Sequence, residues 1–411
     1  MEHVLMLGNG FDLYYKLPTK YNNFLQIVSF LSEILPTDLK NFETVGDILS
    51  AYTSSYDDGF VALCYATHQE LYDSTTLPHS QVDELLALTK NNIWFRYLLK
   101  SFNKDVGWID FEKEISNVIN ALRSLLQNIY PKIRGFDIPD DSLDGHIVRA
   151  FDFSFFGADG RVLIGNVFKT AYRVKAEYLV EYPLGSGNLI TDSAKIISVL
   201  STALYDLSEA LKLYLSIFAE SIIPRYFADN HFRLSLPFQG ISRVITFNYT
   251  NTYEHLYKHT VHHLHGRTDG KIVLGINPDK YDEVADADTL CIAFKKYYQR
   301  VMYGTDTPYQ SWIRNNLKYT LMIMGHSLDV TDADIITELF SNATEITIIY
   351  HDDASKSSYI GNIIKMYGKS GFDKLRKEKK LEFRHIDSDF SEIIKARPQD
   401  PFYYLFTDES I

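Results

Sequence analysis

Cysteine is scarce in this sequence, which limits the kinds of site the chain can hold. Among 411 residues there are only two, Cys64 and Cys291, and they lie far apart. Two cysteines cannot supply a four-ligand zinc module, and they do not indicate a disulfide framework. We therefore expect no structural zinc, and a cytoplasmic rather than a secreted protein.

Long apolar runs and an excess of basic charge are also missing. No stretch approaches the roughly 18 apolar residues of a membrane-spanning helix. The N-terminus has no basic segment followed by a long apolar one, so neither a secretory signal nor a membrane partner is expected. The formal net charge is -12. Because an acidic surface repels phosphate backbones, nucleic acid is not an expected partner.

Linkers rich in Pro and Gly, internal repeats and low-complexity tracts are absent too, so hydrophobic periodicity must define the organisation. Residues 19–239 read as mainly helical, whereas residues 240–411 alternate short apolar strands with helices. Such alternation is typical of a parallel sheet covered on both faces. We predict an α/β fold in which residues 1–18 and 240–411 form a Rossmann-like domain. Residues 19–239 would be a helical insertion that serves as a regulatory, oligomerisation or lid element.

Individual elements can be placed from the same periodicity. Apolar residues recur at steps of three and four from Ile197 to Phe218, which predicts one long helix. Its stripe would either pack within the chain or, as an alternative, form a homo-oligomer through residues 193–221. The strands are expected at 4–7, 244–247, 261–264, 271–274, 319–324, 345–350 and 381–385, and three further helices at 251–258, 331–342 and 354–370.

Polar residues and glycines follow directly after several of these strands. In a parallel sheet, ligands bind beyond the carboxyl ends of the strands. After the first strand, Gly8-Asn9-Gly10 is either a simple turn into a helix or a cradle for phosphate. Leu13 stands where the dinucleotide fingerprint has its third glycine, so this motif alone favours the simple turn.

Asn248 and His265 leave neighbouring predicted strands and form a more informative pair. Asparagine can hydrogen-bond a ribose hydroxyl or orient a water, and histidine is suited to proton transfer near neutral pH. Gly266 allows a sharp turn beside the imidazole. His263 and His265 would share one face of a strand, so a His-x-His metal site is an alternative, although no third ligand is evident.

A third glycine-containing segment, Gly325-His326-Ser327-Leu328-Asp329, follows the most hydrophobic late strand. Gly325 would let a ligand lie over the strand end, and Ser327 could hydrogen-bond a ribose or a phosphate. The alternative is that Asp329 or Thr331 simply caps the next helix. Another predicted helix begins near Trp108-Ile109-Asp110-Phe111-Glu112, where Asp110 would be the cap and Glu112 a favourable first-turn charge.

Taken together, four segments resemble those of sirtuins and sirtuin-like NAD hydrolases. These proteins carry, in order, a Gly-Ala-Gly-x-Ser turn followed by Gly-Ile-Pro, a Thr-x-Asn segment, a His-Gly pair and a Gly-Thr-Ser-Leu-x-Val segment. The corresponding segments here are Gly8–Asp12 with Leu17-Pro18, Thr246-Phe247-Asn248, His265-Gly266 and Gly325–Val330. The resemblance implies a sirtuin-like sheet and a nucleotide ligand.

A closer resemblance is to the AbiH family of bacterial abortive-infection, or anti-phage, proteins. It rests on six segments, which are Gly8–Leu13, Leu17–Tyr21, Trp108-x-Asp110-x-Glu112, Phe247–Thr250, Leu264–Gly266 and Gly325–Ser327. This resemblance implies a cytoplasmic bacterial defence effector with a phage-derived trigger as a further partner.

The two resemblances imply an enzyme that hydrolyses NAD, or a related nucleotide, at the N-glycosidic bond, with NAD as a substrate rather than a cofactor. His265 would be the base, and Asn248 would position the ribose or the water. The expected binding residues are Gly8, Asn9, Gly10, Asp12, Thr246, Tyr249, Gly266, Gly325, His326, Ser327 and Asp329.

Several positions depart from the sirtuin pattern. Thr250 stands where sirtuins have an Asp, while Asn9 and Asp12 replace a small Ala and Ser. The sirtuin zinc ribbon is absent, so protein deacetylation is not expected. Two alternatives therefore stay open. One is a metal-dependent nuclease or phosphohydrolase that holds a hard cation with Asp12, Asp110, Glu112 and Asp329. The other is a non-catalytic nucleotide sensor that acts through a partner.

Overall fold

The computed structural model describes most of the sheet and of the helices around it. The described residues are 2–102, 111–126, 129–131, 168–170, 173–174, 179–181, 185, 188–226, 240–276, 291–305, 318–378 and 380–388. Trp108 and Asp110 lie outside these ranges, so the cap predicted at Asp110 stays a prediction.

Six strands form one parallel sheet in the order β11-β10-β9-β1-β7-β8. The N-terminal strand β1 lies inside the sheet, and its last residue, Leu7, pairs with Thr246 of β7 and Met324 of β9. The strands are β1 (Glu2–Leu7), β7 (Arg243–Thr246), β8 (Val261–His263), β9 (Tyr319–Met324), β10 (Ala343–Tyr350) and β11 (Leu381–His385). The predicted parallel sheet, joined by a strand from far away in sequence, is therefore confirmed.

Apolar residues on both faces explain why β1 takes this central place. Val4 and Met6 belong to one buried cluster and Leu5 and Leu7 to another, so the strand is covered on both sides. A continuous apolar run of this kind is typical of parallel sheets. The first cluster includes α18 (Ala333–Asn342) and α19 (Asp353–Lys377), whereas the second includes α14 (Thr252–Tyr257) and the helices of the insertion.

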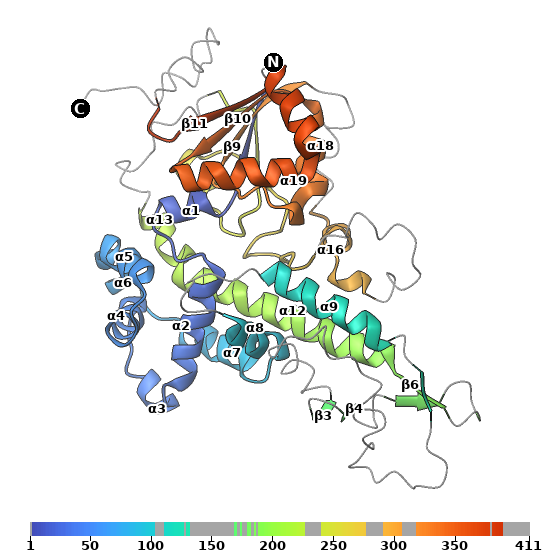
Figure 1. The fold of residues 1–411 in the computed structure, drawn as a ribbon. Helices are drawn as coiled ribbons and strands as arrows, with labels where there is room; N and C mark the ends of the chain where they lie inside the picture. The colour runs from blue at the N-terminus through green and yellow to red at the C-terminus, as the bar shows by residue number, and fades with distance from the viewer. Residues whose placement is uncertain are drawn as a thin grey trace.

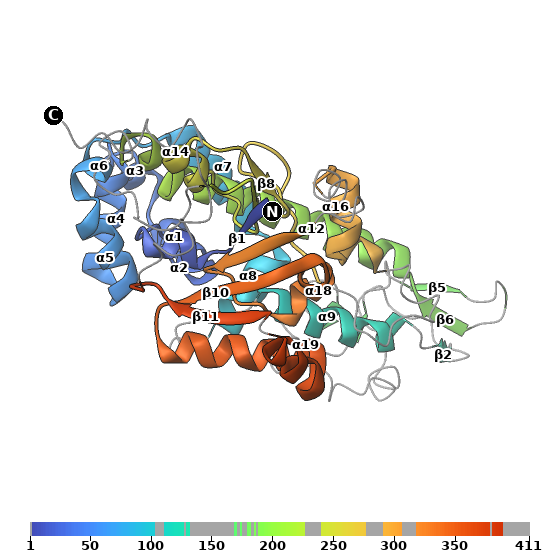
Figure 2. The ribbon, with the colours of Figure 1, turned by 90° about the horizontal axis from the view of Figure 1, so that it is seen from above.

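Most of the remaining helices lie below the sheet, on the side to which the carboxyl ends of the strands point (Figure 1). The view from above agrees, because the sheet there lies over α8, α9 and α12 (Figure 2). These helices are α1 (Gly10–Tyr14), α2 (Tyr21–Glu33), α3 (Pro36–Leu39), α4 (Val45–Ser55), α5 (Gly59–Thr67), α6 (Gln69–Asp73), α7 (His79–Lys90), α8 (Ile93–Ser101), α9 (Phe111–Leu126), α12 (Ser193–Phe218) and α13 (Ile223–Tyr226).

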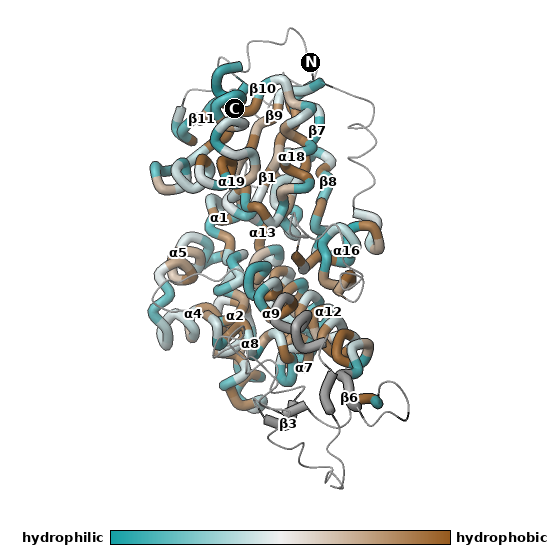
Figure 3. The backbone as a smooth tube through the Cα atoms, turned by 45° about the vertical axis from the view of Figure 1, so that its right-hand side comes forward, coloured by the Kyte–Doolittle hydropathy of each residue, from teal (hydrophilic) through white to brown (hydrophobic). Residues whose placement is uncertain are grey.

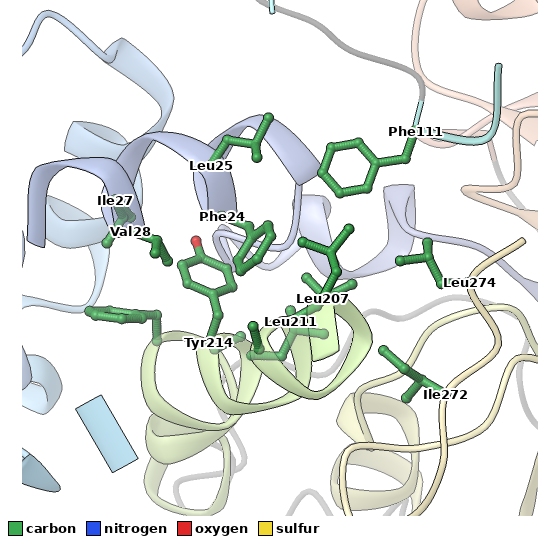
Figure 4. Packing of buried hydrophobic residues seen from close by; sticks show 14 of the residues in the cluster. Phe24, Leu25, Ile27, Val28, Phe111, Leu207, Leu211, Tyr214, Ile272 and Leu274 are labelled. Atoms are coloured by element: carbon green, nitrogen blue, oxygen red, sulfur yellow. The ribbon is translucent and has the colours of Figure 1, made fainter. Parts of the chain in front are cut away.

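The long helix α12 is the centre of the helical part. Leu207, Leu211 and Tyr214 pack against Phe24 of α2, as Figure 4 shows, and the whole predicted stripe is buried. Hydrophobic stretches accordingly occur in the helices as well as in the sheet (Figure 3). The stripe is thus covered by the chain itself, which is the first of its two predicted roles. A second subunit would have to use another face of this helix.

One predicted strand was wrong. Residues 271–274 form only an isolated bridge between Ile272 and Gly266. Gly266 has φ +78°, so the chain reverses immediately after β8 instead of crossing to a new edge. Val273 then donates its N–H to the carbonyl of His265 at 2.7 Å. The segment therefore supports the His265 loop rather than the sheet.

Hydropathy is consistent with the absence of long apolar runs noted in the sequence. In the part of the chain that the structure describes, no helix is both long and apolar enough to cross a membrane.

Candidate functional site

A cavity of about 1010 Å³ lies at the carboxyl ends of the strands. Its walls come from the loops after β1, β7, β8, β9 and β10, and also from α2, α9, α12 and α19. The sheet and the helical part therefore enclose it together. Its volume is at the upper end of the usual range for small-molecule sites.

Most of the residues predicted to bind a ligand line this cavity. They are Asn9, Gly10, Asp12, Asn248, Tyr249, His265, Gly325, His326, Ser327 and Asp329. Three predicted residues, Gly8, Thr246 and Gly266, lie behind the wall. Thr246 accepts the N–H of Asn248 through its hydroxyl at 3.0 Å. Gly266 makes the turn after His265.

The glycine turn after β1 packs against the turn after β9. A Cβ atom on Gly8 would lie 2.5 Å from His326 Cα, and one on Gly10 would lie 2.7 Å from Gly325 Cα. The side chain of Asn9 hydrogen-bonds Thr19, whose hydroxyl donates to Asn9 Oδ1 at 2.6 Å. Backbone of the turn after β9 thus fills the space that a Cβ atom would need on Gly8 or Gly10. Contact of Gly10 with a phosphate stays a prediction.

Asp12 is buried in the cavity wall with one carboxylate oxygen unpartnered. Its Oδ2 accepts the hydroxyl of Thr250 at 2.5 Å, whereas Oδ1 is buried without a hydrogen-bond partner in the described structure. Burial raises the pKa of Asp12 to about 6, although the Thr250 hydroxyl opposes that shift. Thr250 and Asp12 both depart from the sirtuin pattern, and the two side chains hydrogen-bond each other.

Asn248 lies beside Asp12, and its side-chain oxygen is likewise buried without a partner in the described structure. His263 Nδ1 donates to the backbone carbonyl of Asn248 at 2.9 Å and so fixes this loop. The strand β8 ends at His263, and His263 Nε2 lies 3.3 Å from Glu254 Oε2 instead of facing His265. In the described structure His263 is thus held by Glu254 and by the carbonyl of Asn248, and a His-x-His metal site stays an untested alternative.

His265 is a buried imidazole beside a carboxylate. Its Nε2 lies 3.2 Å from Asp332 Oδ1, an ion-pair distance without hydrogen-bond geometry. The ring stands edge-on to Phe247, with centroids 5.0 Å apart. Burial, and then the charge of Lys296, lowers the pKa of His265 to about 4. The side chain is therefore neutral at physiological pH.

His326 is a second imidazole on the same carboxylate. Its Nδ1 accepts the backbone N–H of Leu328 at 2.9 Å, which leaves the Nε2–H to face Asp332 Oδ2 at 3.4 Å. Asp332 is thus flanked by two histidines, one at each oxygen. Burial would raise the pKa of Asp332, but Lys296 and then His265 outweigh it and hold that pKa well below the usual range.

Lys296 and Asp332 are two charged residues at the centre of the site that the sequence did not predict. Lys296 begins α16 (Lys296–Tyr303), and its Nζ lies 2.7 Å from Glu112 Oε1 and 2.7 Å from Asp332 Oδ1. The Lys296 side chain is 0% exposed. Asp332 belongs to an acidic helix start in which the sequence singled out Asp329. No pattern singled out Lys296, because a lysine in a polar helix reads as a solvated charge.

The carboxylates proposed as a metal site do not converge. Asp12 is held by Thr250, Glu112 pairs with Lys296, and Asp329 accepts the N–H of Thr331 at 3.1 Å as a helix cap. Among the described residues, no three His, Cys, Asp or Glu side chains are placed to hold a metal ion. Asp110 lies outside the described residues. Nothing in the described geometry therefore favours the metal-dependent alternative.

Fold and site together define an α/β protein with a large cavity at the carboxyl edge of a parallel sheet. The family model described as "Bacteriophage abortive infection AbiH" matches residues 4–352, which is most of the chain. The chain therefore belongs to the AbiH family, as its motifs predicted. The description of that family is bacteriophage abortive infection. Neither the curated proteins nor the solved structures contain a significant match. The likeness to sirtuins stays a prediction.

Proposed function

We propose that this protein is an anti-phage effector that hydrolyses NAD, or a related nucleotide, at the N-glycosidic bond. Membership of the AbiH family supports the defence role. The observation that carries the chemistry is the pair of His265 and Asp332, 3.2 Å apart in the wall of the cavity that Asn248 also lines. A neutral imidazole backed by a carboxylate is a recurring arrangement for a general base.

The proposed reaction needs a general base and a pocket that holds the ribose. It needs no general acid to protonate the leaving group. The bond between C1′ of the ribose and the nicotinamide nitrogen breaks through an oxocarbenium-like state, by analogy with glycoside hydrolysis. Nicotinamide leaves as a neutral molecule because its ring nitrogen is cationic in NAD. Water forms the new bond to C1′ and gives its proton to His265. Asp332 stabilises the imidazolium that results, and the products are nicotinamide, ADP-ribose and a proton.

The acceptor oxygens of Asp12 and Asn248 favour a ligand with hydroxyl groups. A buried acceptor without a partner costs about 1–3 kcal/mol, and both side chains line the cavity. A ribose hydroxyl could donate to either oxygen after a small rotation of the side chain. Three lysines, Lys16, Lys20 and Lys365, also line the cavity and would supply positive charge for phosphates.

The test is release of nicotinamide from NAD by the purified full-length protein, alone and with phage lysate as a source of the trigger. His265→Ala and Asn248→Ala should each lose roughly 100-fold or more of the rate, since a positioned base contributes about that much. His259→Ala is the matched control, because His259 lies just before β8, outside the cavity lining, and its Nδ1 bonds the neighbouring carbonyl of Thr260 at 2.8 Å. EDTA should leave the rate unchanged.

Three results would count against the proposal. The first is no nicotinamide release by protein that melts cooperatively, with or without lysate. Loss of activity in EDTA would instead support the metal-dependent alternative. NAD recovered intact from the protein, together with unchanged toxicity of His265→Ala in phage-infected cells, would support a sensor.

A further inference from the structure

The helical part of the chain contributes one carboxylate, that of Glu112, to the ion pairs of the site. Glu112 is the second residue of α9, and Phe111 beside it stacks on Tyr21 of α2 with ring centroids 4.2 Å apart and an interplanar angle of 6°. This stacking fixes the start of α9 next to the cavity, and Glu112 lines the cavity. A residue far from the sheet in sequence is thereby brought against Lys296, the cation behind the His265–Asp332 pair.

Close contacts between charged and polar side chains run without a break from α9 to His265. Glu112 Oε1 lies 2.7 Å from Lys296 Nζ, Lys296 Nζ lies 2.7 Å from Asp332 Oδ1, and that oxygen lies 3.2 Å from His265 Nε2. One ammonium therefore faces two carboxylates. Together, Glu112, Lys296 and Asp332 carry one net negative charge when Glu112 is ionised, and none when Glu112 is protonated.

We propose that Glu112 is a positioning residue which the helical part supplies to the active site, and that its negative charge makes His265 able to accept a proton during catalysis. The proposal rests on the proposed role of His265 as base. Protonation of His265 takes the cluster from one net negative charge to none while Glu112 is ionised. Without that charge, the same step leaves a buried net positive charge, which a low-dielectric site disfavours. The sheet alone is then an incomplete enzyme.

The groups that face Glu112 determine when it is charged. Burial raises the pKa of Glu112 to about 7, Lys296 opposes that shift, and Asp332 adds to it. Arg300 pairs with Asp334 at the edge of the cluster, and Glu114, two residues along α9, instead accepts the hydroxyl of Tyr97 at 2.7 Å. Among the described residues, Thr331, His265, His326 and Tyr249 are further polar groups around the cluster. Glu112 therefore loses its charge as the pH falls through about 7.

The first experiment compares pH profiles of nicotinamide release for the wild type, Glu112→Gln and Glu114→Gln. At pH 5.5, wild type and Glu112→Gln should differ by less than about threefold, because Glu112 is already protonated. At pH 8.5, Glu112→Gln should be slower by roughly tenfold or more, the equivalent of one pKa unit at His265. Glu114→Gln should follow the wild type throughout, and Glu112→Asp should recover most of the rate at pH 8.5. Equal slowing of Glu112→Gln at every pH would show a merely structural role and overturn the proposal.

A second readout does not depend on NAD being the substrate. In protein labelled at the imidazole carbons of histidine, the NMR signal of His265 should shift with an inflection near pH 7 that reports Glu112. The inflection should disappear in Glu112→Gln and persist in Glu114→Gln. If the wild type shows no such inflection, the proposal is wrong. If the inflection behaves as expected but NAD is not cleaved, the coupling stands and the proposed function fails.

Folding of Glu112→Gln is expected, because Lys296 keeps its 2.7 Å partner Asp332 and no charge is left alone. Should this variant not fold, the NMR experiment is run on Glu112→Asp. In Glu112→Asp the carboxylate is on a shorter side chain, so the pH of the inflection should change. An unchanged inflection would contradict the proposal.

Discussion

Gly10 donates its backbone N–H to the carbonyl of Gly325 at 2.8 Å, so the turn after β1 is closed by the turn after β9. The two turns come this close because neither has a side chain there. A Cβ on Gly10 would lie 2.7 Å from Gly325 Cα, and one on Gly325 would lie 2.3 Å from the nitrogen of Phe11. Since β1 and β9 are neighbours in the sheet, this contact keeps two walls of the cavity in register.

Gly10→Ala should therefore lower the free energy of unfolding. Insertion of a methyl group against rigid backbone costs roughly 1–3 kcal/mol. Gly59→Ala is the control, because a Cβ at the first residue of α5 meets nothing within 4 Å, and it should change stability by less than about 0.5 kcal/mol. Urea denaturation of both variants measures the difference. Equal stabilities would show that the turns move apart without cost.

Much of the sheet and of the cavity could be predicted from the sequence. The apolar run of β1 is long enough to demand burial on both faces, and polar residues at strand ends must meet at one edge. That is why Asn248, His265 and Gly325 were predicted together, and the structure places all three on one cavity. These are local patterns, which depend only on the order of residues along the chain.

The rest depends on contacts that no local pattern contains. Lys296 is buried only because α9 and the loop after β9 bring Glu112 and Asp332 to its ammonium. Residues 271–274 have a strand-like pattern, but the turn at Gly266 reverses the chain before they reach the sheet edge. The two predicted glycines Gly8 and Gly10 were correctly placed at a turn. Their close neighbour is another loop of the same protein, which sequence order does not reveal.

Lys296→Met should strongly destabilise the protein. The substitution leaves the buried Asp332 and the partly buried Glu112 without their common cation, and removal of one partner from a buried ion pair typically costs about 3–5 kcal/mol. The control is Lys374→Met, since Lys374 is 75% exposed and lies 3.9 Å from Glu378. Such surface pairs contribute little. The free energy of unfolding in urea at pH 7.5 measures both variants, and a loss below about 1 kcal/mol in Lys296→Met would contradict the burial of this cluster.

Asp12→Asn should stabilise the protein at neutral pH. The folded-state pKa of Asp12 is about 6, above the value near 4 of an unfolded chain. Because the folded state holds this proton more tightly, ionisation of Asp12 removes stability as the pH rises from about 4 to about 6. The Asn variant avoids that loss, so it should gain roughly 2–3 kcal/mol at pH 7.5 and nothing below pH 4.

Thermal unfolding across this pH range checks the Asp12 prediction, with Asp83→Asn on the exposed side of α7 as the control. A pH-independent difference between Asp12→Asn and the wild type would show that Asp12 is not an unfavourably buried carboxylate. If Asp12→Asn is more stable but binds nucleotide more weakly, Asp12 lowers stability and contributes to ligand binding.

Gly266→Ala should damage catalysis more than nucleotide binding. Gly266 has φ +78°, and a Cβ there would lie 1.8 Å from the carbonyl oxygen of Lys271, so the loop that carries His265 has to shift. A displacement of the base slows the reaction steeply, whereas Asn248 and Asp12 stay in place on other loops. We expect the rate of nicotinamide release to fall by roughly tenfold or more, while ADP-ribose binds within about threefold of the wild-type affinity. Gly270→Ala is the matched control in the same loop, because its nearest atom would be 3.9 Å away. Calorimetric binding and single-turnover kinetics separate the two effects, and parallel losses of both would place Gly266 in the binding surface itself.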